Sequence, residues 1–307
     1  MRFERLDLNL LVALDALIED RSVSLAARRL FLSQPALSGA LNRLREYFRD
    51  DLLVQSGRQM VLTPKAEELR GPVREALMLI RARITTPLLF DPATAQRQFT
   101  IVASDFAYDV LLAPTFARAA RTAPGITFEL LATDRLAMER LERGEADVVI
   151  TIGSYLSTVH PRRRMFEDEP AIICWSGSKH AAGLTEESFL TAGHAIAFFG
   201  DDRHPAFTET HFTQQGIARK IEIRLPNFSA LPQAVIGTER IATIWRRHAE
   251  FFATFLPITV HRPPWALPRI VEEAQWHSLR TNDEGIKWLV ELLATQAEQL
   301  SPLPLER

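Results

Sequence analysis

The chain has 307 residues, more than one hydrophobic core usually serves, so two or three domains are expected. Its composition, 47% hydrophobic and 24% charged, is ordinary for a soluble globular protein; the single cysteine excludes an intramolecular disulfide framework, and no apolar run predicts a transmembrane helix. The net charge of −2 gives no support by itself to nucleic-acid binding.

The first apolar stretch predicts a helix over about residues 8 to 20, with Asp7 as its N-cap. Acidic residues run through this stretch, which argues against a signal peptide and favours a cytoplasmic protein. A second helix follows, with Ser24 as its cap and with Leu25 and Leu30 turned inward. A tight turn then leads into a third helix.

Ser33 is placed to cap this third helix, and Pro35 suits its first turn. Apolar residues at helical spacing predict its packed face: Leu37, Ala40, Leu41, Leu44 and Tyr47. The opposite face then presents the polar side chains of Gln34, Ser38, Asn42 and Arg45. A helix with a packed back and a short polar front is what a helix-turn-helix protein inserts into the major groove of DNA.

Alternating residues over 52–55 and 60–62, around Ser56-Gly57-Arg58-Gln59, predict a two-stranded wing. Thr63-Pro64 then starts a long helix. Apolar residues form one stripe along it at heptad-like spacing: Ala66, Leu69, Val73, Leu77, Ile80 and Ile84. The stripe favours a linker helix that dimerises two chains, and the alternative is a helix packed on its own domain.

From Gln98 onwards, strands and helices alternate. Strands are predicted at 99–103, 127–131, 146–152, 171–175, 195–199, 220–225, 241–245 and 273–279, and helices at 106–120, 134–143, 186–192, 207–215, 230–236 and after Asp283. Helices of this length between strands predict parallel α/β sheets. Arg162-Arg163-Arg164 is predicted as a solvated turn between two such units, and the chain is expected to cross back near 265–269.

Several of these stretches resemble the LysR-type transcriptional regulators. They are Ala26-Ala27-Arg28-Arg29-Leu30, Ser33-Gln34-Pro35-Ala36-Leu37-Ser38, Leu41-Asn42-Arg43-Leu44-Arg45, the wing and Leu62-Thr63-Pro64. Within that family, residues 2–17 and Tyr47-Phe48-Arg49-Asp50-Asp51 resemble the nodulation-regulator (NodD-like) branch. Over 91–307 the resemblance rests on element order and on the ending from Trp276-His277 to Trp288-Leu289.

The resemblance implies a multidomain fold: an N-terminal all-α winged helix-turn-helix with a linker helix, then a C-terminal α/β effector domain of two subdomains, like a periplasmic binding protein. The expected boundaries are 1–64 for the DNA-binding domain, 65–90 for the linker (dimerisation) helix and 91–307 for the effector domain. Subdomain I is expected at 96–161 and 268–300, and subdomain II at 162–267.

The same resemblance implies a homodimer or homotetramer bound to double-stranded promoter DNA, where it contacts RNA polymerase. It also implies a small-molecule inducer, which the NodD-like branch makes a flavonoid or a simpler phenolic. Basic and acidic residues nearly balance over residues 1–64, so a single copy would bind DNA weakly. An oligomer with duplicated DNA-binding units is therefore expected.

The predicted DNA contacts are Ser33, Gln34, Pro35, Ser38, Asn42, Arg43, Arg58 and Thr63. Gln34 suits an adenine edge and Pro35 a thymine methyl, while Arg58 at the wing tip suits the minor groove or a phosphate. The alternative is that these residues only start a helix or are solvated. Gly39 stands where many relatives have a longer polar side chain, so sequence specificity is expected to lie elsewhere.

The predicted effector-binding residues are Ser104, Asp105, Phe106, Ile152, Gly153, Phe199, Gly200, Phe228 and Thr243. They follow or end predicted strands, and ligands of open α/β sheets lie outside the carboxyl ends of the strands. The phenylalanines favour an apolar or aromatic inducer. The alternatives are that Ser104 only caps a helix and that Phe199 is core, while Arg203 and His204 either bind a carboxylate or lie on a loop surface.

Catalysis, metals and cofactors are not expected. The eight histidines are scattered, with no zinc-ligand spacing, and no nucleophile elbow or phosphate-binding glycine loop occurs. Cys174 lies inside a predicted strand and is expected to be a buried, inert thiol. Two rivals to a ligand-switched regulator remain: a ligand-insensitive architectural DNA-binding protein and an α/β enzyme.

Overall fold

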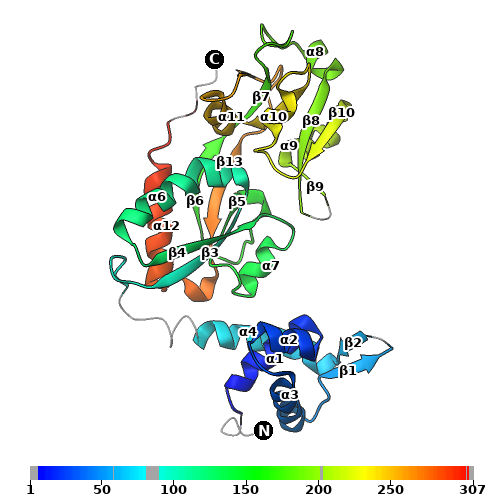
Figure 1. Cartoon of the computed structure of the whole chain (residues 1–307), viewed down its shortest axis with the longest axis vertical. Helices are drawn as coiled ribbons and strands as arrows, with labels where there is room; N and C mark the ends of the chain where they lie inside the picture. Colours follow the sequence, from blue (N-terminus) through cyan, green and yellow to red (C-terminus); the bar gives the residue numbers. More distant parts are fainter. Residues whose placement is uncertain (1–5, 58, 81–89, 201–202, 302, 304–307) are drawn as a thin grey trace. The chain divides into compact units, whose positions relative to one another are not determined.

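The computed structural model describes residues 6–57, 59–80, 90–200, 203–301 and 303, which divide into two compact units, residues 1–87 and 88–307. Figure 1 shows the elements of both units, coloured along the sequence. The predicted multidomain fold, a winged helix-turn-helix followed by an α/β part, is confirmed. None of the described helices is long and apolar enough to cross a lipid bilayer.

The first unit is a small helical domain with a wing. Its elements are α1 (Asn9–Asp20), α2 (Val23–Arg29), α3 (Gln34–Phe48), β1 (Leu53–Ser56), β2 (Gln59–Leu62) and α4 (Pro64–Ile80). Leu14, Leu37 and Leu44 are almost completely buried in one shared core, which fixes how the helices pack. The antiparallel pairing of β1 with β2 forms the predicted wing.

The helix caps decide where these helices begin. Ser33 caps α3 as predicted, since its hydroxyl accepts a hydrogen bond from the backbone N–H of Ala36 at 3.3 Å. The predicted cap of α2 was wrong: Ser22, not Ser24, accepts from the N–H of Leu25 at 3.3 Å, because the helix begins at Val23. In consequence Leu25 is exposed, and α2 buries only its two alanines.

The apolar stripe of α4 packs within its own domain. Ala66, Val73 and Leu77 belong to the same buried core as α1. This part of the helix therefore packs on its own domain, which was the alternative to a dimer contact. Arg74 reinforces the contact through ion pairs with Asp15, at 3.4 Å, and with Glu19 of α1. Ile84, predicted in the stripe, lies outside the described residues, and the dimerising role stays a prediction.

The second unit contains two mixed sheets. The first has the strand order β4-β3-β5-β13-β6, with β3 (Arg97–Ala103), β4 (Ile126–Ala132), β5 (Val148–Ile152), β6 (Arg162–Asp168) and β13 (Ile270–Gln275). Its helices are α5 (Asp105–Ala107), the π-helix η3 (Tyr108–Leu112), α6 (Ala113–Thr122), α7 (Ala137–Glu142) and α12 (Glu284–Ala297), with short 3-10 helices at Gly153–Tyr155 (η4) and Ser278–Arg280 (η5). Helices α6 and α12 cover one face and α7 the other (Figure 1).

The second sheet has the order β10-β8-β11-β7-β12, with β9 paired to β8. Its strands are β7 (Pro170–Trp175), β8 (Gly193–Phe199), β9 (His204–Pro205), β10 (Lys220–Leu225), β11 (Ile241–Trp245) and β12 (Ile258–His261). Its helices are α8 (Glu186–Thr191), α9 (Phe207–Gln214), α10 (Leu231–Val235) and α11 (Arg246–Ala253). Helices α8 and α9 bury one face of this sheet, and α10 and α11 the other.

Three predictions about these sheets were wrong. The sheets are not parallel throughout: β13 runs antiparallel to β5 and β6, and β7 antiparallel to β11 and β12, because the chain crosses between the sheets and returns. Arg162-Arg163-Arg164 is no turn but the start of edge strand β6, where Arg162 pairs with Glu273 at 3.3 Å. The first crossing therefore follows Asp168 and not Pro161, and β12 and α11 were not predicted.

Candidate functional site

The polar face of α3 is open. Leu37, Leu41 and Leu44 are buried, whereas Gln34 and Asn42 are exposed and Ser38 is half-buried. The predicted packed and polar faces of the helix are thus the observed ones. Gln34 and Asn42 are therefore accessible to a partner, while Arg45 of the last turn donates to Oδ1 of Asn42 at 3.5 Å.

Arg45, in that last turn, has a structural task. Its guanidinium donates to the backbone carbonyls of Asp51 and Leu53, both at 2.8 Å, and so ties α3 to the start of the wing. Arg43 forms an exposed ion pair with Asp7 at 3.1 Å, which leaves it open to exchange partners.

Thr63 joins the wing to α4. Its hydroxyl donates to Asp50 at 2.6 Å and accepts from the N–H of Ala66 at 3.2 Å, so its first role is to cap α4. Arg58, the predicted wing-tip contact, lies outside the described residues. The turn beside it is formed by Gly57 at φ +62°, a backbone conformation that favours glycine.

A cavity of about 300 Å³ lies between the two α/β subdomains. Both subdomains line it, with these residues: Ser104, Thr133, Asp134, Arg135, Ala137, Met138, Thr151, Ile152, Tyr155, Phe199, His204, Pro205, Ala206, Phe207, Phe228, Trp245 and Glu272. The carboxyl ends of β3, β5, β8 and β11 all contribute, as expected for this class of fold. The lining is mainly apolar and aromatic, with a few hydroxyl and carboxyl groups among it.

Four predicted effector residues line this cavity: Ser104, Ile152, Phe199 and Phe228. Sequence reasoning missed most of the others. Thr133 and Asp134 directly follow β4, so the strand-end rule applied to that strand would have found them. Glu272 lies in the middle of β13, and nothing in the sequence pattern marked it. For Arg203 and His204 the alternatives are carboxylate binding and a loop surface. His204 lines the cavity, whereas Arg203 does not.

The remaining predicted effector residues have other surroundings. Phe106 is completely buried against Phe166 and Trp245 and is core. Gly153 lies against Glu273, where a Cβ would come within 2.2 Å of the carboxylate. Gly200 is a turn residue at φ +68°, and Thr243 is buried in β11.

Asp105 joins the two subdomains. Its Oδ2 accepts hydrogen bonds from the backbone N–H and the hydroxyl of Ser229, both at 2.6 Å. Nearby, His248 Nε2 lies 2.8 Å from Asp109 Oδ2. Asp105 and Asp109 belong to the helix after β3, and their partners belong to the second subdomain. These two contacts form a latch beside the cavity, and Asp105 does not line it.

Two buried carboxyl groups lie where the subdomains meet. Burial, and then the negative charge of Asp168, raises the pKa of Glu272 to about 8. Burial also raises the pKa of Asp168 to about 7, even though the backbone N–H groups of Glu169 and Arg247 donate to it. At neutral pH, Glu272 is therefore mainly an uncharged carboxylic acid.

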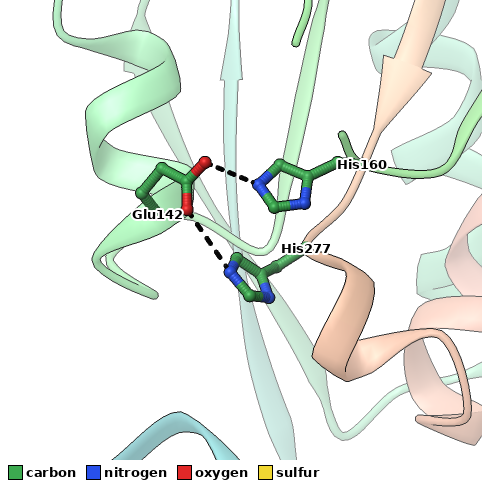
Figure 2. Close-up of side chains that lie close together, drawn as sticks. All are labelled: Glu142, His160 and His277. Atoms are coloured by element: carbon green, nitrogen blue, oxygen red, sulfur yellow. Dashed lines mark hydrogen bonds and ion pairs between the residues drawn. The ribbon is translucent and has the colours of Figure 1, made fainter. Parts of the chain in front are cut away.

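Glu142, His160 and His277 form a compact cluster away from this cavity (Figure 2). The two Nε2 atoms point to one carboxylate, at 2.7 Å for His160 and 3.5 Å for His277. Sequence spacing missed the cluster because its members come from three separate segments.

The second ring nitrogens argue against a metal in this cluster. The backbone N–H of Ser278 donates to Nδ1 of His160 at 3.3 Å, and that of Leu279 to Nδ1 of His277 at 3.1 Å. Each neutral ring therefore has its proton on Nε2, whereas a metal-binding Nε2 needs that proton on Nδ1, facing an acceptor. The cluster is better described as a hydrogen-bonded clasp between α7, the segment before β6, and η5.

Cys174 is buried in β7, as predicted, with its Sγ 3.6 Å from Nε2 of His261. Burial raises the pKa of its thiol, which lowers its reactivity. Cys174 is not among the residues that line the cavity.

Comparisons with known proteins agree with the division of the chain into a helix-turn-helix unit and an α/β unit. A family model described as "Bacterial regulatory helix-turn-helix protein, lysR family" matches residues 8–67, and one described as "LysR substrate binding domain" matches residues 92–298. The chain is 40% identical over 302 residues to Nodulation protein D 1 of Rhizobium tropici, with 98% of each chain covered.

Solved structures of similar fold cover nearly the whole chain. A probable transcriptional regulator of Pseudomonas aeruginosa, PA0477, is 27% identical, with a TM-score of 0.64 over 95% of this chain and 98% of that one. A full-length OxyR variant from the same organism is 15% identical, with a TM-score of 0.66 over 97% of this chain and 99% of that one, and supports the fold alone.

Proposed function

The chain belongs to the LysR family of bacterial transcriptional regulators, and on that basis we propose that a small aromatic molecule of phenolic type binds in its cavity and switches its activity at promoter DNA. Family membership implies promoter binding, a small effector and oligomers. The relatives and the related structures are regulators and not enzymes, which removes the α/β enzyme from consideration.

The lining of the cavity is the observation that supports the proposal of an aromatic ligand. Phe199, Phe207, Phe228 and Trp245 supply aromatic faces, and Tyr155 adds a ring with a polar end. Pockets for small ligands combine such apolar surface with a few polar groups that fix orientation. A ligand-insensitive architectural protein would have no need of this cavity, so the lining supports the switched regulator.

For DNA recognition we propose the face of α3 and its surroundings. Gln34, Pro35, Ser38 and Asn42 would reach bases or phosphates, and Ser33, Arg43, Arg58 and Thr63 would bind the flanking backbone. Two such helices in a dimer would enter successive major grooves about 34 Å apart. A chromosome-binding regulator acts in the cytoplasm of a bacterium, which supports the proposed location.

The proposed switch depends on the angle between the two subdomains. A ligand shifts an equilibrium only if it binds one arrangement more tightly than the other. The cavity and the Asp105–Ser229 latch lie at the same junction, so ligand contacts there can favour one angle. A changed angle would alter the spacing of DNA-binding domains in a dimer or tetramer, and with it the contact with RNA polymerase.

A thermal-shift screen of the full chain with flavonoids and simple phenols tests the ligand class. An inducer at one hundred times its dissociation constant should stabilise the protein by about 2.7 kcal/mol. If no aromatic compound raised the melting temperature, the proposal of an aromatic ligand would be wrong. If only aliphatic acids raised it, the ligand class would be aliphatic acids instead.

A substitution on α3 tests the DNA-binding face. Ser38→Ala should weaken binding to promoter DNA by about 1–3 kcal/mol, because a hydroxyl that meets a base or phosphate is lost. Gel-shift titration at fixed salt measures this, with Ser154→Ala in the effector unit as the matched control. Equal affinity of the folded Ser38 variant and the wild type would remove this residue from the interface.

A further inference from the structure

Glu272 is the more buried of the two carboxylic acids among the residues that line the cavity. The residue is 3% exposed and lies on the central part of β13, opposite Ile152 of β5 and Phe166 of β6. Apolar neighbours on both adjacent strands leave it few polar partners. The backbone of a sheet strand holds it there, which gives the cavity a fixed polar point among aromatic rings.

One oxygen of this carboxyl group is unsatisfied. Oε2 is shielded from solvent and has no hydrogen-bond partner among the residues that the structure describes. A buried polar atom without a partner is costly, so such atoms in folded proteins are normally satisfied by protein, water or ligand. Because Glu272 lines the cavity, a small rotation of its carboxyl group would bring this oxygen to an occupant of the cavity, which would supply the missing partner.

The charges around Glu272 decide what that occupant can be. The other titratable residues of the lining are Asp134, Arg135, Tyr155 and His204. Asp134 is neutralised by two hydrogen bonds from Arg140, at 2.6 and 2.8 Å, and Arg135 already takes part in another interaction. Asp168 lies close enough for its charge to disfavour ionisation of Glu272. A second anion beside this pair would be repelled.

We propose that Glu272 forms the hydrogen bond that orients the ligand, and that the cavity selects an uncharged hydroxyl or carbonyl group at this point over a carboxylate. An uncharged acid can donate through its O–H to a carbonyl or accept from a phenolic hydroxyl. Buried carboxyl groups with a raised pKa act as donors in this way. The inference rests on the proposed function, because it takes the cavity to be the effector site.

A matched pair of probes tests the selection in the full chain. 4-Hydroxyacetophenone is uncharged at pH 7, and 4-hydroxybenzoate has the same size but a carboxylate; quenching of tryptophan fluorescence reports binding, because Trp245 lines the cavity. The wild type should bind the ketone at least about tenfold more tightly than the acid. Glu272→Gln should bind the ketone within about threefold of wild type, whereas Glu272→Leu should lose about tenfold.

Glu273→Gln is the control, since Glu273 is the next residue of the same strand and pairs with Arg162 outside the cavity. Equal binding of the ketone by Glu272→Leu and wild type, or tighter binding of the carboxylate by wild type, would overturn the role of Glu272. Failure of both probes to bind the wild type would instead count against the proposed aromatic ligand.

A ligand-free readout separates these failures. Folded wild type keeps a proton on Glu272 that the unfolded chain releases above its ordinary pKa, so wild-type stability should fall between about pH 5 and 8. The melting temperature of Glu272→Gln relative to wild type should therefore rise across that range. A constant difference would show an ordinary carboxylate at this position and would overturn the inference whatever the probes do.

Discussion

Phe31 combines an exposed aromatic ring with a left-handed backbone conformation. The residue is 97% exposed, and its backbone has φ +55° in the turn between α2 and α3. A bulky residue in this left-handed conformation costs free energy, and an exposed ring recovers none of it through packing. The turn is thus held in place by the helices on either side and not by its own residue.

Replacing Phe31 with asparagine should therefore stabilise the first unit. Asn tolerates the left-handed region, so Phe31→Asn should raise the free energy of unfolding by about 1 kcal/mol. Urea titration measures this, with Phe31→Leu as a control that keeps the strain and should change little. A loss of stability in the asparagine variant would mean that the ring has a packing role.

Among the elements, α3 depends on a brace at its end. Two carbonyl groups at the start of the wing accept hydrogen bonds from Arg45, which is partly shielded from solvent. Arg45→Ala should lower the free energy of unfolding by about 1–3 kcal/mol, because bonds to a charged donor are lost. Arg43→Ala should lower it by less than about 0.5 kcal/mol, because its ion pair is exposed.

The two arginine variants separate structure from binding. In gel shifts at moderate temperature, Arg43→Ala should weaken DNA binding while urea titration finds it as stable as the wild type. If Arg43→Ala and Arg45→Ala had equal free energies of unfolding, the hydrogen bonds of Arg45 would add nothing to stability.

Helix α12 depends on a single acidic cap. Asp283 accepts hydrogen bonds from the N–H groups of Gly285 and Ile286 at 3.0 and 3.2 Å, and from the Arg97 guanidinium at 2.7 and 2.9 Å. Burial opposes its ionisation, but Arg97 and Arg280 outweigh burial and hold the pKa of Asp283 at about 2.

This lowered pKa predicts an acid-sensitive helix. The stabilisation from Asp283 is complete above its unfolded pKa near 4 and is lost as the pH falls through about 2, a change of about 2 kcal/mol. Unfolding of the full chain between pH 5 and 2 measures this slope, and Asp283→Asn should flatten it. A variant with the wild-type slope would place the acid sensitivity at other carboxylates.

These elements show what local sequence can predict. Ser33 and Asp283 mark helix starts because a cap acts within three residues. Ser22 and Ser24 have the same capping group, and the packing of the helix determines which of them becomes the cap. Arg162-Arg163-Arg164 looked like a turn because charged residues on an edge strand face solvent. Glu272 faces the cavity only through the pairing of β13, which no local pattern encodes.

At the scale of the whole molecule, the two subdomains of the second unit share a hydrophobic core, and the latch adds polar contacts beside it. Asp105 accepts two short hydrogen bonds from Ser229, and Asp109 contacts His248. These bonds link the helix after β3 to the second subdomain, so a change of the angle between the sheets would have to stretch or break them. If the cavity binds a ligand as proposed, the free energy of this contact must be small enough for ligand binding to offset it.

A double-mutant cycle measures the latch. Asp105→Ala and Ser229→Ala should each lower the free energy of unfolding, and the double variant should lower it by at least about 0.5 kcal/mol less than the sum. Chemical denaturation followed by tryptophan fluorescence gives the four values. Additive effects would mean that the two side chains do not interact in solution.

The buried state of Cys174 has a practical outcome for spectroscopy. Since this is the single cysteine of the chain and its thiol is shielded, maleimide dyes would find no native attachment point. Cysteines introduced at exposed positions such as Arg121 and Leu190, one in each subdomain, could then take a donor and an acceptor fluorophore. Energy transfer between them would report whether the angle between the subdomains changes when the proposed phenolic ligands are added.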